Sequence, residues 1–303
     1  MNIRALAVGI ISLLGCTTAA PSQPLATDAV IAAAQNAPLN EYAASGRWNA
    51  PFPPFNVIGN IYYVGTETVG SFLITTREGH FLIDGVLAQT VPQIVTNMNA
   101  LGFDIRDVKY LLNTHAHIDH AGGLAGLQRL SGAGMVASAA DRGPLENGDI
   151  GYGPTAGMRF PPIRVDQFVG DGDTLTLGGV TLTAHMTPGH TAGCTSWSMD
   201  VTGADGAQRT AFFHCSSTVA GQSLAPESYP GMVAAYRASF ARVRGLHADV
   251  FLANHDNFFD LHAKRARQLG GDANAFVDPG GLQTFNTRTE QAFEAELARQ
   301  NAN

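Results

Sequence analysis

Three histidines and one aspartate fall within six consecutive positions of this chain, in the segment His115-Ala116-His117-Ile118-Asp119-His120. Histidine accounts for only 10 of the 303 residues, so random placement explains this cluster poorly. Neutral imidazoles and carboxylates are the ligands that Zn²⁺ accepts, and catalytic zinc keeps one coordination position open. The segment therefore predicts a metal site, with zinc favoured and with iron or manganese as alternatives, on a scaffold that can gather ligands from several loops.

The spacing within the cluster suggests two metal positions. In an extended segment, residues i and i+2 point the same way, so His115 and His117 can bind one metal together. The glycine turn at residues 121–123 then redirects the chain, and Asp119 and His120 face a second position.

Each candidate ligand segment follows an apolar stretch of strand length. These stretches are Val108–Leu112 before His115, Leu182–Met186 before His190, and Val250–Ala253 before His255. Loops that leave the ends of buried strands can converge on one edge of a sheet, where catalytic groups are commonly mounted. The sequence thus predicts that the three segments meet in space.

Two further histidines complete the predicted ligand set. His190, in Thr187-Pro188-Gly189-His190, would give the first metal a third imidazole, and the alternative is a histidine that only forms part of a turn. His255 would join Asp119 and His120 on the second metal, and Asp256 is its nearest competitor.

One carboxylate and five other histidines lie outside this set. Asp84, at the end of another expected strand, is predicted to accept a hydrogen bond from a ligand imidazole, and a plain turn aspartate is the alternative. The other histidines are predicted to be surface or hydrogen-bonded structural residues: His80, His185, His214, His247 and His262.

Strands and helices are intermixed along the chain, which favours an α/β class. Expected strands are 60–65, 70–75, 79–84, 108–113, 134–137, 180–185, 195–199, 209–214 and 249–253, and expected helices are 86–101, 229–246 and 260–269. The run Thr287-Arg288-Thr289-Glu290 has the pattern of a capping box that opens a last helix. No linker or repeat divides the chain, so a single catalytic domain is predicted from residue 28 to 303.

The first residues have the features of an export signal. A short charged start and an apolar run end in Leu13-Leu14-Gly15-Cys16, which resembles a lipobox, so residues 1–16 are predicted to be a signal peptide that leaves a lipidated, membrane-anchoring Cys16. The alternative is cleavage near Ala19 or Ala20. Residues 17–27 would be a flexible tether, and a periplasmic location is expected.

Two cysteines remain in the predicted domain, Cys194 and Cys215. A pair of this kind in an exported protein often forms a disulfide, but the sequence leaves the bond open. An alternative makes Cys215 a zinc ligand. The net charge of −7 argues against a nucleic-acid partner, because such partners require clustered basic residues.

The run His115-Ala116-His117-Ile118-Asp119-His120, with His190 and His255 behind it, resembles the metallo-β-lactamase superfamily over nearly the whole predicted domain. The resemblance implies a four-layer αββα sandwich with metals at one edge of two central sheets. It leaves the substrate open, because relatives include thioester and lactone hydrolases, persulfide dioxygenases and nucleases.

The segment Ala211-Phe212-Phe213-His214-Cys215-Ser216-Ser217-Thr218 separates these relatives, because thioesterases, lactonases and dioxygenases usually have a metal-binding aspartate there. This chain has none between Asp205 and Asp249, and so resembles the third subclass of class B β-lactamases more closely. On that resemblance Ser216 and Thr218 bind the carboxylate of the substrate, although Cys215 departs from the pattern and leaves the alignment uncertain by one residue.

The resemblance implies an exported zinc-dependent hydrolase with two Zn²⁺, a carbapenemase-type β-lactamase associated with antibiotic resistance. It would hydrolyse the amide bond of penicillins, cephalosporins and carbapenems through a metal-bound hydroxide that Asp119 orients. The alternatives are a hydrolase of a lactone or thioester, and a binding protein with an inactive site. A small-molecule substrate and a monomeric state are expected, and the loop 147–162 is expected to influence substrate choice.

Overall fold

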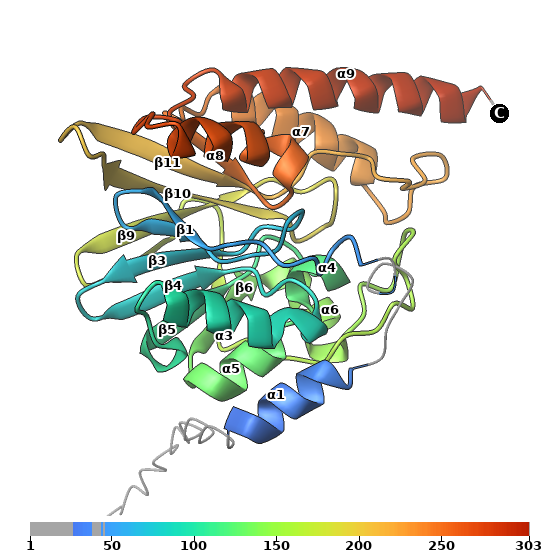
Figure 1. Cartoon of the computed structure of the whole chain (residues 1–303). Helices are drawn as coiled ribbons and strands as arrows, with labels where there is room; N and C mark the ends of the chain where they lie inside the picture. The colour runs from blue at the N-terminus through green and yellow to red at the C-terminus, as the bar shows by residue number, and fades with distance from the viewer. Residues whose placement is uncertain (1–26, 38–43, 45, 303) are drawn as a thin grey trace, which may run out of the picture.

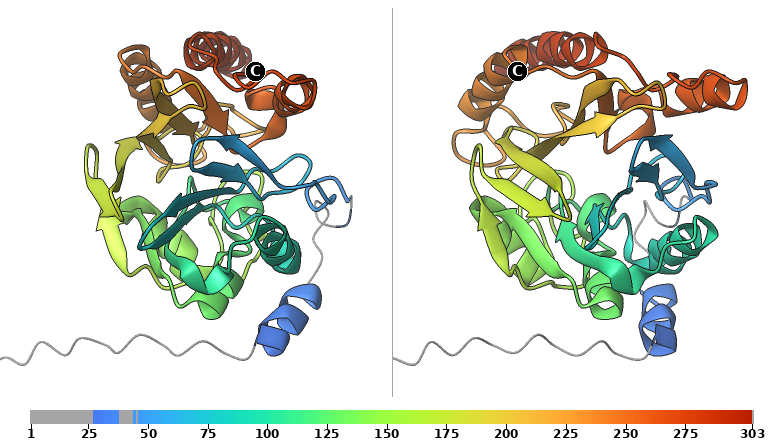
Figure 2. Two further views of the ribbon diagram at one scale, coloured as in Figure 1. Left: turned by 60° about the vertical axis from the view of Figure 1, so that its left-hand side comes forward. Right: turned by 90° about the vertical axis from the view of Figure 1, so that its left-hand side faces the viewer.

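The computed structural model describes residues 27–37, 44 and 46–302. Two β-sheets face each other, and helices cover the outer face of each sheet (Figures 1 and 2). The predicted four-layer αββα sandwich is therefore confirmed. The expected signal peptide, Cys16 and nearly all of the tether lie outside the described residues.

Seven strands of the described chain form the first sheet, in the order β1-β2-β3-β4-β5-β6-β7. They are β1 (Phe55–Ile58), β2 (Ile61–Tyr63), β3 (Phe72–Thr76), β4 (Gly79–Ile83), β5 (Val108–Leu112), β6 (Gly134–Ser138) and β7 (Gln167–Val169). Side chains alternate between its two faces, as strand geometry requires. Phe81 and Ile83 of β4 face the second sheet, whereas Leu82 packs against the helices, and the sheet is apolar on both faces.

The second sheet has the order β12-β11-β10-β9-β8 within the described residues. Its strands are β8 (Thr174–Leu177), β9 (Val180–Met186), β10 (Thr195–Thr202), β11 (Gln208–His214) and β12 (Val250–Ala253). Trp197 and Phe213 on this sheet pack with Phe72 and Phe81 on the first, and these aromatic rings fill the space between the sheets. Burial of such large apolar surfaces is the main stabilising term of the sandwich.

Helices form the two outer layers. Beside the first sheet lie α1 (Thr27–Gln35), α3 (Val91–Ala100), α4 (Ile118–Ala121), α5 (Leu124–Ser131) and α6 (Arg142–Asn147), with short 3₁₀ turns at 88–90, 105–107 and 139–141. Beside the second lie α7 (Met232–Arg244), α8 (Leu261–Leu269) and α9 (Gly281–Asn301), with a 3₁₀ turn at 256–258 (Figure 1). None of the helices in the described part of the chain is long and apolar enough to cross a membrane.

The expectation for the last helix is wrong. α9 begins at Gly281, so Thr287 and Glu290 lie inside it and do not cap its start. The hydroxyl of Thr289 instead donates to the carbonyls of Phe285 and Asn286 within the helix, a bond that threonine can form in a helix interior. The nine expected strands are present, and their ends differ from the expected positions by at most three residues.

Candidate metal centre

Five strands end at the same edge of the sandwich. β4 is parallel to β5, β11 is parallel to β12, and β9 runs in the same direction as β11 because both pair antiparallel with β10. A backbone bridge between Val69 and His255 joins the two sheets at this edge. The loops that leave these strands carry Asp84, His115, His190 and His255, so the predicted ligands come from neighbouring strand ends.

Three imidazoles meet at one point, which we call the three-histidine site: His115, His117 and His190. The Nδ1 atom of His117 lies 3.1 Å from Nε2 of His115 and 3.1 Å from Nε2 of His190. Ligand atoms at the usual zinc–nitrogen distance of about 2.0 Å would stand about 3.3 Å apart around a tetrahedral ion. The three nitrogens are thus arranged as one face of a metal site.

Contacts at the far side of each ring determine which nitrogen carries the hydrogen. Nδ1 of His190 lies 2.8 Å from the carbonyl of Thr218, and a carbonyl can only accept, so this nitrogen donates and Nε2 keeps its lone pair. Nδ1 of His115 lies 3.2 Å from the Thr114 hydroxyl, which in turn donates to Asp84. Both rings therefore present a bare Nε2 atom to the site.

Burial keeps these three rings neutral. Loss of water contact lowers the pKa of His115 and His117 well below the ordinary value, and the neighbouring imidazoles lower it further. Burial also lowers the pKa of His190 to about 4. Neutral imidazole is the form that binds a metal, so at neutral pH these three histidines can bind one without first losing a proton.

A second group, the carboxylate site, consists of Asp119, His120 and His255. Oδ2 of Asp119 lies 3.2 Å from Nε2 of His120 and 3.3 Å from Nε2 of His255. The two imidazole nitrogens are 3.3 Å apart. Nδ1 of His255 faces the carbonyl of Thr68 at 3.3 Å, which leaves Nε2 for the site. Asp256 is directed elsewhere and pairs with His262.

Asp84 contacts the carboxylate site directly and reaches the three-histidine site only through Thr114. Its Oδ2 atom lies 3.2 Å from Nδ1 of His120, and its carboxylate accepts from the backbone and the hydroxyl of Thr114 at 2.6 and 2.8 Å. Asp84 adopts a left-handed backbone conformation, with φ of 61°, which L-residues rarely occupy. The structure thus places it where a metal-ligating histidine would donate its other N–H.

A close backbone approach brings Asp84 and His120 together. The amide of Gly85 donates to the carbonyl of His120 at 2.8 Å. A Cβ atom on Gly123 would lie 2.1 Å from the carbonyl oxygen of Gly85, so only glycine fits where the junction of α4 and α5 meets the residues after β4.

At the carboxylate site, the neighbouring carboxylates change the protonation of His120. Burial alone would lower the pKa of His120, but the Asp119 and Asp84 carboxylates outweigh it and raise the pKa to about 10. Burial would raise the pKa of Asp119, but His120 and His255 lower it well below the ordinary value. Without a metal, His120 is therefore protonated at neutral pH and balances the nearby negative charge.

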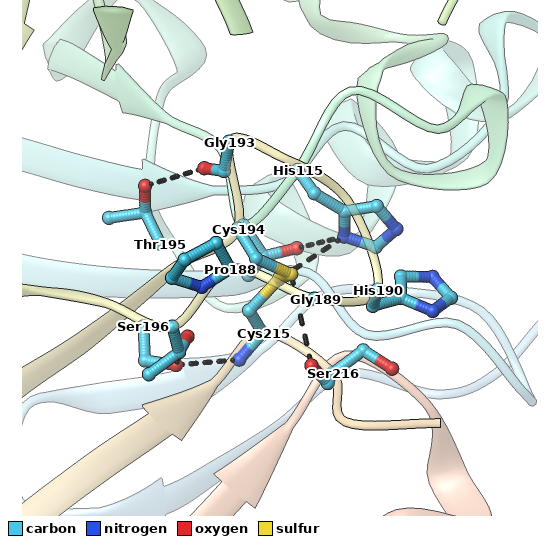
Figure 3. Close-up of a disulfide and its surroundings, with 12 residues drawn as sticks. His115, Pro188, Gly189, His190, Gly193, Cys194, Thr195, Ser196, Cys215 and Ser216 are labelled. Carbon is cyan, nitrogen blue, oxygen red and sulfur yellow. Dashed lines mark hydrogen bonds between the residues drawn. A yellow bond between two sulfur atoms is a disulfide. The ribbon is translucent and has the colours of Figure 1, made fainter. Parts of the chain in front are cut away.

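A disulfide joins Cys194 and Cys215 beside the three-histidine site (Figure 3). It connects the loop that carries His190 with the segment that follows β11. The Sγ atom of Cys215 lies 3.6 Å from Nδ1 of His115, on the side of the ring away from the other imidazoles. A sulfur bonded in a disulfide is not a thiolate, so the alternative of Cys215 as a zinc ligand is not supported.

The segment after β11 places two hydroxyls near the histidine loop. Ser216 Oγ and Thr218 Oγ1 lie 3.1 Å apart, and the Thr218 carbonyl binds His190. Tyr152, from the loop expected to influence substrate choice, accepts a hydrogen bond from the amide of Ala192 at 2.9 Å. Loop 147–162 thus contacts the chain two residues beyond His190.

The donor sets fit two zinc ions. Nδ1 of His117 faces the bare Nε2 atoms of His115 and His190, and three imidazole nitrogens that converge in this way suit a cation. Each group offers three ligand atoms, one fewer than a tetrahedral zinc ion takes, so one coordination position of each ion would remain for a water molecule or substrate.

Apart from Asp84, sequence reasoning did not identify the polar groups that orient the ligands. Asn254 donates to the hydroxyl of Thr114 at 3.1 Å, and the carbonyls of Thr68 and Thr218 receive the two histidine N–H groups described above. Asn254 and Thr114 each precede a ligand in the sequence, which was the available signal. Backbone carbonyls leave no such signal.

The comparisons with known proteins agree with this geometry. The model of the metallo-β-lactamase superfamily matches residues 64–203. BJP-1, a subclass B3 metallo-β-lactamase of Bradyrhizobium japonicum, is 42% identical with a TM-score of 0.81, and the match covers 86% of this chain and 98% of BJP-1. FEZ-1, a metallo-β-lactamase from Legionella gormanii, is 35% identical with a TM-score of 0.80, over 84% of this chain and 99% of FEZ-1.

The chain belongs to the metallo-β-lactamase superfamily. Its structural relatives include a subclass B3 enzyme, as its sequence predicted, and membership supports a metal-dependent hydrolase. Curated relatives match shorter segments. A hydroxyacylglutathione hydrolase of Maricaulis maris is 35% identical over 96 residues, which are 32% of this chain and 31% of that protein. The chain spans a third to a half of the first curated relatives.

Proposed function

We propose that this protein is an exported dizinc β-lactamase that hydrolyses the amide bond of penicillins, cephalosporins and carbapenems. One observation carries the proposal: the segment after β11 has a disulfide and a pair of hydroxyls. A hydrolase of thioesters or lactones would be expected to have a metal-binding carboxylate at this place. Similarity to β-lactamases along almost their whole length supports it.

The metal ligands divide into two groups with different roles. Zinc ions, when bound, would polarise the amide carbonyl and lower the pKa of a water molecule toward about 7. His115, His117 and His190 would hold one ion, and Asp119, His120 and His255 the other. Asp119 would also accept a hydrogen bond from the attacking water and so orient it toward the carbonyl.

Three further residues would bind the substrate or orient a metal ligand. The hydroxyls of Ser216 and Thr218 would donate to the carboxylate that β-lactams carry beside the ring, which places the amide at the metals. Asp84 would keep the ring of His120 in its ligating orientation. Neither role requires a covalent intermediate with the protein.

The location is part of the proposal. The first 16 residues support export to the periplasm and a lipid anchor on Cys16, where a β-lactamase would meet antibiotics that act outside the cytoplasm. Labelled palmitate should be incorporated by the full chain and lost in Cys16→Ala. Incorporation by both forms would contradict the anchor.

Substrate assays of the purified protein test the activity. We expect hydrolysis of a chromogenic cephalosporin that a chelator abolishes and added zinc restores, with little turnover of acyl-homoserine lactone or glutathione-thioester substrates. The segmental similarity to a hydroxyacylglutathione hydrolase makes the thioester the relevant competitor. Turnover of the lactone or thioester without turnover of the cephalosporin would overturn the proposal.

A further inference from the structure

A buried imidazole outside the metal centre contacts hydroxyl groups on both sides. His214 ends β11 and is 1% exposed. Its Nε2 atom lies 2.7 Å from Ser217 Oγ, and its Nδ1 atom lies 3.3 Å from Ser196 Oγ. Burial lowers the pKa of His214 to about 3, so the ring is neutral at physiological pH.

These contacts continue into a longer buried chain. Ser196 Oγ lies 2.8 Å from Thr187 Oγ1 and accepts the backbone N–H of Cys215 at 3.0 Å. We call Thr187, Ser196, His214 and Ser217 the hydroxyl–imidazole chain, and all four residues are buried. It connects the start of the His190 loop with the segment that follows β11. Figure 3 shows the hydrogen bond between the Cys215 backbone and Ser196.

Hydrogen atoms can be assigned along this chain in two ways. With the hydrogen on Nδ1, His214 donates to Ser196, Ser196 donates to Thr187, and Ser217 donates to Nε2. With the hydrogen on Nε2, all three bonds reverse. Both arrangements satisfy each ring nitrogen, and in both the imidazole binds Ser217 directly.

Ser217 is flanked by the two hydroxyl residues of the proposed substrate site. Its neighbours Ser216 and Thr218 approach each other at 3.1 Å between their hydroxyls. The Thr218 carbonyl accepts from His190 at 2.8 Å and from the Tyr236 hydroxyl at 2.7 Å. Ser217 is thus the immediate neighbour of both hydroxyl residues and of the backbone carbonyl that orients His190.

We propose that His214 is a positioning residue that acts through Ser217 to hold Ser216 and Thr218 for binding of the substrate carboxylate. The substrate part of this inference rests on the proposed β-lactamase function. The structural part, which is that the imidazole determines the conformation of the segment 216–218, does not depend on the substrate.

Substitutions on both sides of the bond test the proposal. His214→Phe keeps a ring in the core but removes both hydrogen bonds, and Ser217→Ala removes only the bond to the segment. Each should raise KM for a cephalosporin about five- to tenfold while kcat changes less, as expected for loss of one buried hydrogen bond that aids binding. The double variant should be no worse than His214→Phe, because both changes remove the same bond.

His185 supplies a matched control. Its Nε2 atom lies 2.8 Å from Ser198 Oγ on the same sheet, but this pair does not reach the segment 216–218. His185→Phe should leave KM within about twofold of the unchanged protein. His214→Gln, which can still donate to Ser217, should recover part of the loss. Equal effects of His185→Phe and His214→Phe, or additive effects of His214→Phe and Ser217→Ala, would overturn the proposal.

A measurement without substrate separates this inference from the proposed function. In the zinc-loaded protein, ¹⁵N NMR should show a neutral His214 between pH 5 and 8, and Ser217→Ala should shift its Nε2 resonance and the amides of residues 216–218. Unchanged resonances would refute the positioning role. Absence of cephalosporin turnover with these shifts present would refute only the β-lactamase function. If His214→Phe does not fold, Ser217→Ala alone decides both readouts.

Discussion

The two candidate metal sites lie side by side but differ in charge. The three-histidine site is neutral, and its rings are oriented by a carbonyl and a hydroxyl. The carboxylate site contains Asp119 and is backed by Asp84, so two negative charges surround His120. At the three-histidine site, burial keeps the imidazoles unprotonated and ready to bind a metal. At the carboxylate site, His120 keeps a proton until a cation replaces it.

This difference suggests separate tasks for the two sites. A cation at the neutral site keeps most of its charge, which favours polarisation of a carbonyl and attraction of an anionic substrate. A cation at the carboxylate site is largely balanced, and Asp119 can orient water there. The predictions below test whether the two sites differ in this way.

The largest effect is expected from the residue that acts in both binding and catalysis. Asp119→Asn should lower kcat by about a thousandfold, because it removes a ligand and the acceptor that orients water. Ser216→Ala should cost about tenfold or less, mainly in KM, because it only removes one contact to substrate. Steady-state kinetics with one cephalosporin compare them, and equal losses in kcat would contradict the division of roles.

Removing the disulfide should affect the two sites unequally. The bond closes a loop with a sequence separation of 21, so the double variant Cys194→Ala, Cys215→Ala should lose about 3 kcal/mol in the free energy of unfolding. Zinc affinity should fall more at the three-histidine site, whose loop the bond restrains. Denaturant unfolding and zinc titration measure both quantities. An equal loss of zinc affinity at both sites would contradict the claim that the disulfide restrains the three-histidine site in particular.

Asp84 contacts a ligand of the carboxylate site but is not a ligand itself, so its substitution tests how much this support contributes to zinc binding. Asp84→Asn should weaken zinc binding there by about 10- to 100-fold, as loss of a carboxylate that supports a ligand histidine typically does. Asparagine tolerates the left-handed conformation at this position, so the effect should come from the lost charge. Titration with a competing chelator measures it, and an equal change at the three-histidine site would contradict the assignment.

Much of the centre could be predicted from the sequence because its ligands are near one another or follow apolar strands. His115, His117, Asp119 and His120 share one segment, and the structure brings His190 and His255 to them. Strands β1, β7 and β8 were not anticipated, and β7 and β8 are largely exposed and lack an apolar run.

Other features depend on tertiary contacts that a linear pattern does not contain. The residues 287–290 match a capping box, but α9 starts earlier because residues 281–286 already pack in the core through Leu282 and Phe285. The sequence predicts that His214 is a surface or hydrogen-bonded structural residue, and the structure shows that it is buried and hydrogen-bonded. Its partner Ser196 comes near it only when β10 and β11 pair, whereas Ser217 lies three residues further along the chain.

The smallest expected difference between the two sites is the number of protons released when zinc binds. His120 has a pKa raised to about 10 in the metal-free protein, so zinc binding at the carboxylate site between pH 6 and 8 should release one proton. Affinity there should rise about tenfold for each pH unit. The three-histidine site, where the pKa of His190 is about 4, should release almost none. Calorimetry in buffers of different ionisation enthalpy gives both values, and equal proton release would refute the contrast.

Anomalous X-ray scattering from a zinc-loaded crystal tests the central claim most directly. The account predicts two zinc peaks, one among Nε2 of His115, Nδ1 of His117 and Nε2 of His190, and one among Asp119, His120 and His255. A crystal grown with excess zinc that shows no peak at either position, or a peak at only one of them, would contradict it.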